Sequence, residues 1–255
     1  MRSATRTALR HVTRMTIEDA APYTPAQRAA IIASYPAHER EARTKGVPLL
    51  GSGRVFPIDE MLIKVTPFVI PEHWPVLGAL DFGWDHPTAA VKLAWDRDAD
   101  CVYVTHAYRK KEATPLIHAA ALTPWGESLP WAWPHDGLAH DKGSGEALKD
   151  QYEAHGLNML PAHATFEDGS NGVEAGLMAM LDRMQTARLK VFGHLDEWFE
   201  EFRLYHRKDG LVVKLADDLM SATRYALMSL RFAEVDRAPM DEMAERAEAY
   251  DPFAW

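Results

Sequence analysis

The apolar positions from residue 76 onward repeat with two different spacings. Short apolar runs bounded by polar turns are typical of buried strands, and we expect strands over 76–80, 89–95, 101–108, 129–133, 157–160, 189–192 and 210–215. Helical spacing between Pro and Gly breaks predicts helices over 114–122, 145–155, 171–188, 195–205 and 219–232. The order, a hairpin and then alternating helices and strands, predicts an α/β fold with a mixed β-sheet flanked by helices.

The first 70 residues follow a different pattern. One helix is expected over 24–43, with Thr24 as N-cap and Pro25 at the first helical position. Repeated Gly and Pro then break the chain between residues 46 and 57. We therefore divide the sequence into an N-terminal helical and loop connector (1–70), a compact domain (71–233) and a C-terminal tail (234–255).

Composition narrows the class of protein. The 255 residues are 47% hydrophobic, which is enough for a folded core. The single cysteine, Cys101, excludes a disulfide framework and a Cys-based zinc site. Because no run of 18 apolar residues occurs, we expect no membrane span. The net charge of −9 argues against nucleic-acid binding, but residues 234–251 hold seven acidic and two basic residues, so bulk charge does not decide the question.

Acidic residues stand where predicted elements end. Asp81 closes the first strand, Asp136 follows the strand at 129–133, and Asp217 and Asp218 precede the last helix. Carboxylates at the ends of neighbouring strands would meet at one edge of the sheet, and a hard cation such as Mg²⁺ or Mn²⁺ would relieve their repulsion. Two ions about 3.5–4 Å apart can clamp a phosphodiester. A simpler interpretation is also open: each Asp is a turn former, or in the case of Asp218 a helix N-cap.

Four motifs follow one another along the chain: 34–46 together with 51–57, then 80–90 (LDFGWDHPTAA), 133–137 (WPHDG) and 216–226 (ADDLMSATRYA). They resemble the nuclease part of large terminase subunits of tailed phages. The first is similar to that family's linker between motor and nuclease, and the other three are similar to its acidic motifs. Many relatives carry a His after the first Asp of the closing motif and another Asp three residues later. Here Asp218 and Ser221 take those places, so the main ligand could be Asp217 or Asp218.

The resemblance implies an RNase H-like fold and an endodeoxyribonuclease that uses two Mg²⁺ or Mn²⁺ ions, held by Asp81, Asp136 and Asp217 or Asp218. Its implied role is to cut concatemeric double-stranded viral DNA during genome packaging, in the cytoplasm of an infected or lysogenic bacterial host. Expected partners are the portal protein, the small terminase subunit and an ATPase motor. The sequence contains no P-loop, so we expect the motor outside this chain.

Basic residues and histidines supply further candidates. His140 could assist proton transfer, and Lys142 could hold a phosphate or stabilise a leaving charge. Cations expected to contact DNA phosphates are Lys142, Arg183, Arg188, Lys190, Arg203, Arg207, Lys208 and Arg224. The alternative for each of these residues is a position on the solvated surface with no role in DNA binding.

Two other functions remain open on the sequence alone. Asp81-Phe82-Gly83 followed by Thr88 also fits the first motif of an actin-like phosphate-binding domain, although no second phosphate motif is evident. A non-catalytic interaction module that docks on the portal through the acidic tail is the second alternative.

Overall fold

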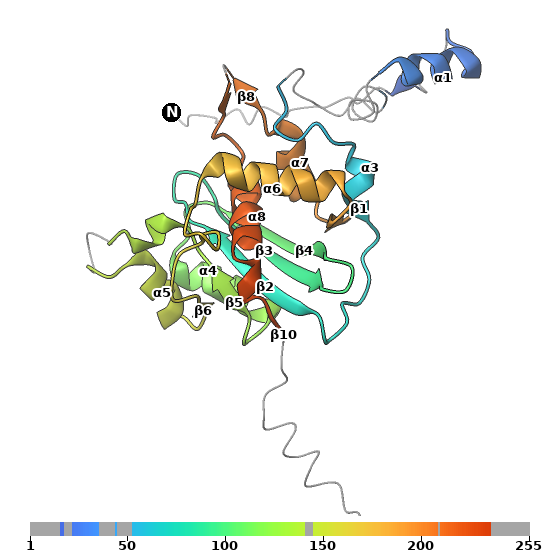
Figure 1. Cartoon of the computed structure of the whole chain (residues 1–255). Helices are drawn as coiled ribbons and strands as arrows, with labels where there is room; N and C mark the ends of the chain where they lie inside the picture. Colours follow the sequence, from blue (N-terminus) through green and yellow to red (C-terminus); the bar gives the residue numbers. More distant parts are fainter. Residues whose placement is uncertain are drawn as a thin grey trace, which may run out of the picture.

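The computed structural model describes residues 16–17, 22–35, 44, 53–140, 145–208 and 210–235. Its centre is a mixed sheet in the order β1-β7-β4-β3-β2-β5-β6, with β10 also paired to β2 (Figure 1). The strands of this sheet are β1 (Lys64–Val65), β2 (Pro75–Asp81), β3 (Thr88–Asp96), β4 (Cys101–Lys110), β5 (Pro130–Ala132), β6 (Asn158–Met159), β7 (Leu189–Phe192) and β10 (Glu234–Val235). The predicted α/β class with a mixed, helix-flanked sheet is confirmed.

Strand pairing brings the ends of β2 and β5 to the same edge. The hairpin of β2 and β3 is antiparallel, from the pair Val76↔Ala94 to the pair Asp81↔Ala89. β5 lies parallel to β2 on its other side, with Ala79 opposite Ala132. Because parallel neighbours end on the same side, Asp81 and the chain that follows β5 emerge together.

Helices cover both faces of the sheet (Figure 1). They are α4 (Pro115–Leu122), α5 (Leu148–Ala154), α6 (Val173–Gln185), α7 (Asp196–Leu204) and α8 (Asp218–Met228). Along β2, Leu77 and Ala79 join the core cluster that contains α6, α7 and α8, whereas Val76 and Leu80 join the cluster of α4 and α5. Side chains of successive strand residues point to opposite faces of the sheet, so a strand buried on both faces contributes to the two clusters in this way. Asp81, two residues after Ala79, therefore points to the side of α8.

The end of the predicted connector packs into the core. Phe56 is completely buried and stacks on Phe202 of α7 at a centroid distance of 6.1 Å. The short helix α3 (Glu60–Ile63) leads into β1, which extends the sheet by pairing parallel to β7. Residues 53–65 thus share the core of the compact domain whose predicted first residue is 71. The boundary itself stays a prediction.

Several predicted elements are shorter in the structure. The first helix, α1 (Pro25–Ser34), has the predicted Thr24 cap, completed by Gln27, but it ends at Ser34. The strand expected over 210–215 is the two-residue β9 (Leu211–Val212), paired with β8 (Arg207–Lys208). The last helix ends at Met228, and a 3-10 turn, η4 (Leu230–Phe232), follows. Residues 236–255, most of the predicted tail, lie outside the described residues.

Candidate active site

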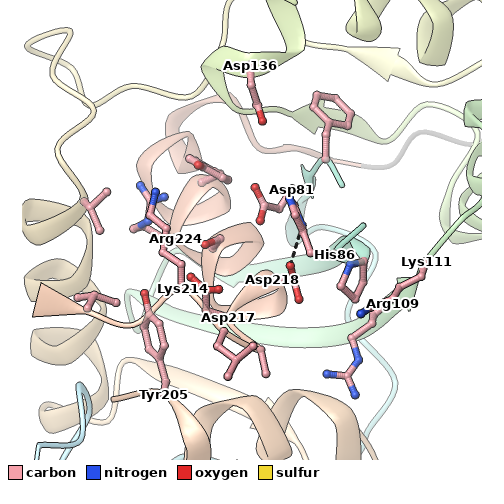
Figure 2. Close-up of a pocket in the computed structure, with 18 of the residues that line it drawn as sticks. Asp81, His86, Arg109, Lys111, Asp136, Tyr205, Lys214, Asp217, Asp218 and Arg224 are labelled. Carbon is pink, nitrogen blue, oxygen red and sulfur yellow. Dashed lines mark hydrogen bonds and ion pairs between the residues drawn. The ribbon is translucent and has the colours of Figure 1, made fainter. Parts of the chain in front are cut away.

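Four carboxylates from three segments line one open pocket of about 710 Å³ (Figure 2). Asp81 is the last residue of β2, and Asp136 lies in the 3-10 turn η3 (His135–Leu138) that follows β5. Asp217 is the N-cap residue of α8 and Asp218 its first residue, directly after a left-handed turn at Ala216, whose φ is 54°. The structure therefore brings together all four acidic residues that the sequence suggests as metal ligands.

The carboxylates act on one another electrostatically. Burial is the main cause that raises the pKa of Asp81 well above its usual value, and the charges of Asp136, Asp218 and Asp217 raise it further. Desolvation likewise raises the pKa of Asp136 and of Asp217, and the charge of Asp218 adds to the shift of Asp217. The pocket thus concentrates negative charge that protons or cations would relieve.

Asp218 pairs with a histidine that the sequence analysis did not select. Its Oδ1 lies 3.1 Å from Nδ1 of His86, in the loop between β2 and β3 (Figure 2). The side chain of Asp218 is nearly buried, whereas that of His86 is mostly exposed. The loop is held by Thr88, whose hydroxyl oxygen accepts from the amide of Gly83 and donates to its carbonyl. His86 is therefore anchored at the rim of the pocket, next to a candidate ligand.

The first turn of α8 is capped by a residue from another helix. Asp217 is the N-cap residue, but its side chain makes no capping hydrogen bond, and Asp218 lies one position further on, so neither acts as the helix cap. Instead the completely buried Glu201 of α7 accepts from the amides of Leu219 at 2.6 Å and Met220 at 3.3 Å. Glu201 thereby fixes the backbone that carries Asp217 and Asp218.

Arg109 of β4 connects this cap to the wall of the pocket. Its guanidinium donates to Glu201 at 3.0 Å and to Glu200 at 2.9 Å. Burial, followed by the charge of Asp218, raises the pKa of Glu201 to about 7, against the opposing effects of the Leu219 amide and Arg109. Because Arg109 is bound by carboxylates, it stabilises the site rather than offering a free cation.

Other cations surround the carboxylates. Lys110, the last residue of β4, and Lys111 after it both line the pocket. In Figure 2, Lys111 lies on one side of the carboxylates, and Lys214 and Arg224 lie on the other. The lysines were not selected from the sequence, because nothing in their local pattern separates them from surface charges. Arg224 carries a usable signal: it is seven residues after Asp217, two helical turns along the same face.

Apart from Arg224, the described cations chosen from the sequence lie elsewhere or are already paired. Arg183 and Arg188 bind Asp100 in the hairpin loop, at the opposite end of β3 from Asp81, and Lys190 donates to the carbonyl of Leu62. Arg207 pairs with Glu174 at 2.6 Å. Lys208 is exposed on the β8–β9 hairpin.

The structure places neither candidate from the loop after η3 in the pocket. His140 is exposed and its Nδ1 lies 2.9 Å from the carbonyl oxygen of Gly145. It does not line the pocket. Lys142 lies outside the described residues.

The donor set suits a hard divalent cation by its chemistry. All four acidic residues offer oxygen, the ligand that Mg²⁺ and Mn²⁺ prefer, and their mutual repulsion favours a bound cation. Within the described part of the chain, no three His, Cys, Asp or Glu side chains stand close enough to hold one ion as they are placed. Side-chain rotation, including release of Asp218 from His86, would have to precede metal binding.

Comparison with known proteins agrees with this fold and site. A mixed sheet with carboxylates at the end of β2, in the turn after β5 and at the start of α8 defines an RNase H-like domain. The family model "Terminase RNaseH-like domain" matches residues 78–230, and the chain belongs to this family. A second model, for the N-terminal part of the large terminase subunit of T4-like viruses, matches residues 2–63.

Curated relatives are large terminase subunits. The chain is 51% identical over 227 residues to that of Salmonella phage P22, which covers 89% of this chain and 46% of the relative. It is also 51% identical over 218 residues to that of Enterobacteria phage LP7, covering 85% and 46%. The chain thus spans about half the length of the curated relatives it matches.

Solved structures show the same architecture. The nuclease domain of the P22 large terminase superposes with a TM-score of 0.69 at 49% identity, covering 73% of this chain and 97% of that one. The large terminase of a thermophilic bacteriophage gives a TM-score of 0.55 at 16% identity, covering 86% and 55%, and so shows the fold alone. Among the helices described here, none is long and apolar enough to cross a membrane.

Proposed function

We propose that this chain is an endodeoxyribonuclease that uses divalent cations to cut concatemeric double-stranded viral DNA during genome packaging. The observation that carries the proposal is the shared pocket lined by Asp81, Asp136, Asp217 and Asp218, inside a domain of the terminase RNase H-like family. The 49% identity with the P22 nuclease domain supports the same class of activity.

Asp81, Asp136 and the pair Asp217 and Asp218 would hold Mg²⁺ or Mn²⁺, and the two ions expected from the sequence remain part of the proposal. When bound, the cations supply an activated water and stabilise charge on the phosphate. The protein's own contribution is to fix the ligands: β2 presents Asp81 from a buried strand, and Glu201 holds the first turn of α8. Lys110, Lys111 and Lys214 at the pocket would attract the DNA backbone.

The remaining parts of the proposal concern the whole packaging machine. Because the matched relatives are about twice as long, we propose that this domain works with an ATPase motor, a portal protein and a small terminase subunit. Its place of action would then be the cytoplasm of the bacterial host. Contacts from lysines to phosphates carry no base information, so we expect cleavage without marked sequence preference.

Supercoiled plasmid provides the test of activity. Wild-type protein should nick and linearise it in Mn²⁺ or Mg²⁺, and EDTA should stop the reaction. Asp81→Asn should abolish cleavage, whereas Asp85→Asn, an exposed carboxylate in the neighbouring loop that does not line the pocket, should leave it unchanged. Cleavage that persists in EDTA or in Asp81→Asn would overturn the proposal.

A further inference from the structure

The pocket contains a buried arginine that lacks a carboxylate partner. Arg224 is only 4% exposed, yet it lines the pocket beside the carboxylates. Its guanidinium lies 3.7 Å from the sulfur of Met228 and 4.3 Å from the centre of the Tyr225 ring. Among the residues that the structure describes, no carboxylate stands within 4.0 Å of it, whereas Arg109 and Arg207 each have one.

Such a charge is costly unless something compensates it. Arginine stays protonated in proteins, and the charge of Arg224 lowers the pKa of Asp81, so the carboxylates of the pocket offset part of this cost from a distance. None of the described carboxylates forms a close ion pair that would occupy the planar face of N–H donors. The guanidinium therefore lies at the pocket wall without a close anionic partner among them, as expected of a residue that binds an anionic ligand.

The neighbouring helix makes room for this side chain. A methyl group on Gly176 of α6 would come within 2.6 Å of both Cγ and Cδ of Arg224. Glycine inside a helix costs about 0.5–1 kcal/mol relative to alanine, so its presence here is not explained by helix stability. The contact fixes the aliphatic stem of Arg224 between α6 and α8, which leaves the guanidinium at the pocket wall.

We propose that Arg224 forms an anion subsite that binds a phosphodiester oxygen of the DNA strand in the pocket. This assignment rests on the proposed nuclease function, which it extends by naming the group that holds the substrate. The planar guanidinium suits phosphate, because two parallel N–H groups can donate to two oxygens. Arg224 and Lys111 lie on opposite sides of Asp81 and Asp218 in Figure 2, so phosphates could be held on both sides of the carboxylates.

Inorganic phosphate tests the subsite without DNA or metal. In EDTA and at constant ionic strength, phosphate should raise the melting temperature of the wild-type protein above its value in chloride. Arg224→Met, which keeps an apolar stem of similar length, should lose this response while folding at least as stably. Arg231→Met is the matched control: this arginine donates to the carbonyls of Thr165 and Met228, outside the pocket, so the phosphate response should persist.

DNA binding gives a second readout. For a short duplex in EDTA, Arg224→Met should weaken binding about tenfold or more and should lower the slope of log Kd against log salt by about one. Arg224→Lys keeps the charge but loses the two parallel N–H groups. Its Kd and its salt slope should therefore lie between those of the wild type and those of Arg224→Met. Should Arg224→Met fail to fold, Gly176→Ala, which displaces the stem, provides the test through the same loss of phosphate response.

The outcomes separate this subsite from the nuclease function. Loss of the phosphate response in Arg224→Met supports the subsite, even if the wild-type protein shows no metal-dependent cleavage. A phosphate response and a salt slope equal to those of the wild type in a folded Arg224→Met overturn the subsite, even if the protein cuts DNA. A wild-type protein on which phosphate has no effect beyond that of chloride also overturns it.

Discussion

The side-chain oxygen Oε2 of Glu201 accepts a 2.6 Å hydrogen bond from the backbone amide of Leu219, so that one helix caps the next beside the pocket. Removing the carboxylate would leave buried amides without an acceptor and Arg109 without its most buried partner. We therefore expect Glu201→Ala to lower the free energy of unfolding by about 3–5 kcal/mol, as broken buried pairs do. Chemical denaturation measures the loss.

The amide of glutamine provides the matched comparison for this cap. Glu201→Gln retains an oxygen that can accept from Leu219 and Met220, so it should lose only about 1.5–3 kcal/mol with the charged bond to Arg109. It should also keep metal binding, because the start of α8 stays in place. Equal losses of unfolding free energy in Glu201→Ala and Glu201→Gln would show that the side-chain oxygen of Glu201 does not hold the first turn of α8.

Replacing Asp81 should stabilise the protein in the absence of metal. Burial and three nearby carboxylates oppose the charge of Asp81 at neutral pH, so Asp81→Asn should raise the melting temperature in EDTA by about 2–4 °C for each kcal/mol of relieved repulsion. The same substitution should remove the further rise that Mn²⁺ gives the wild type. Asp85→Asn should change neither value. A lower melting temperature for Asp81→Asn in EDTA would be evidence against the repulsion.

The packing of the predicted connector can be measured with two phenylalanines. Phe56 is completely buried against Phe202 and Tyr205, so Phe56→Ala should cost about 3–5 kcal/mol of unfolding free energy. Phe68 is 41% exposed, and Phe68→Ala should cost clearly less. A small loss at Phe56 would indicate that residues 53–65 are not part of the core and would favour a domain that begins at residue 71.

Buried His118 should make the protein less stable in mild acid. It is 1% exposed and its Nδ1 lies 2.9 Å from the hydroxyl of Tyr108. Burial, and secondarily the charge of Lys110, lower the pKa of His118, against an opposing hydrogen bond with the backbone of Ala113. Below the unfolded pKa of about 6.5, the unfolded chain therefore binds more protons than the folded one, and stability falls as the pH falls toward the folded pKa.

Urea unfolding at several pH values between about 7.5 and 5.5 isolates this contribution. The free energy of unfolding of His118→Gln should fall less steeply with acid than that of the wild type, by at most about 1.4 kcal/mol per pH unit. Parallel curves for the two proteins would mean that His118 is not held neutral by burial.

The ends of the strands were predictable from the sequence, and so were the acidic residues placed on them. The apolar run before Asp81 marks this residue as a strand end, and the short strand before Asp136 places it in the turn that follows. The hairpin turn at 96–100 fixes β3 and β4 as neighbours. The parallel pairing of β2 and β5, which the structure shows, then brings these two carboxylates to the same edge of the sheet.

Long-range pairing is what the sequence did not reveal. Arg183 and Arg188 carry the same charge as a DNA-contacting residue, and only the folded chain shows that Asp100 binds both. Glu201 looks like one more polar residue of an amphipathic helix, because its contact with Leu219 spans 18 positions. Arg224 had a local signal, its helical spacing from Asp217. Its burial against Gly176 of another helix is a long-range contact that only the structure shows.

Crystals soaked in Mn²⁺ test the central claim most directly, because the anomalous signal locates each ion. The account predicts anomalous peaks in the pocket, bounded by carboxylate oxygens of Asp81, Asp136 and Asp217 or Asp218, with His86 no longer paired to Asp218. The peaks should vanish in Asp81→Asn. Peaks only outside the pocket, at Mn²⁺ concentrations that support DNA cleavage in solution, would contradict the account.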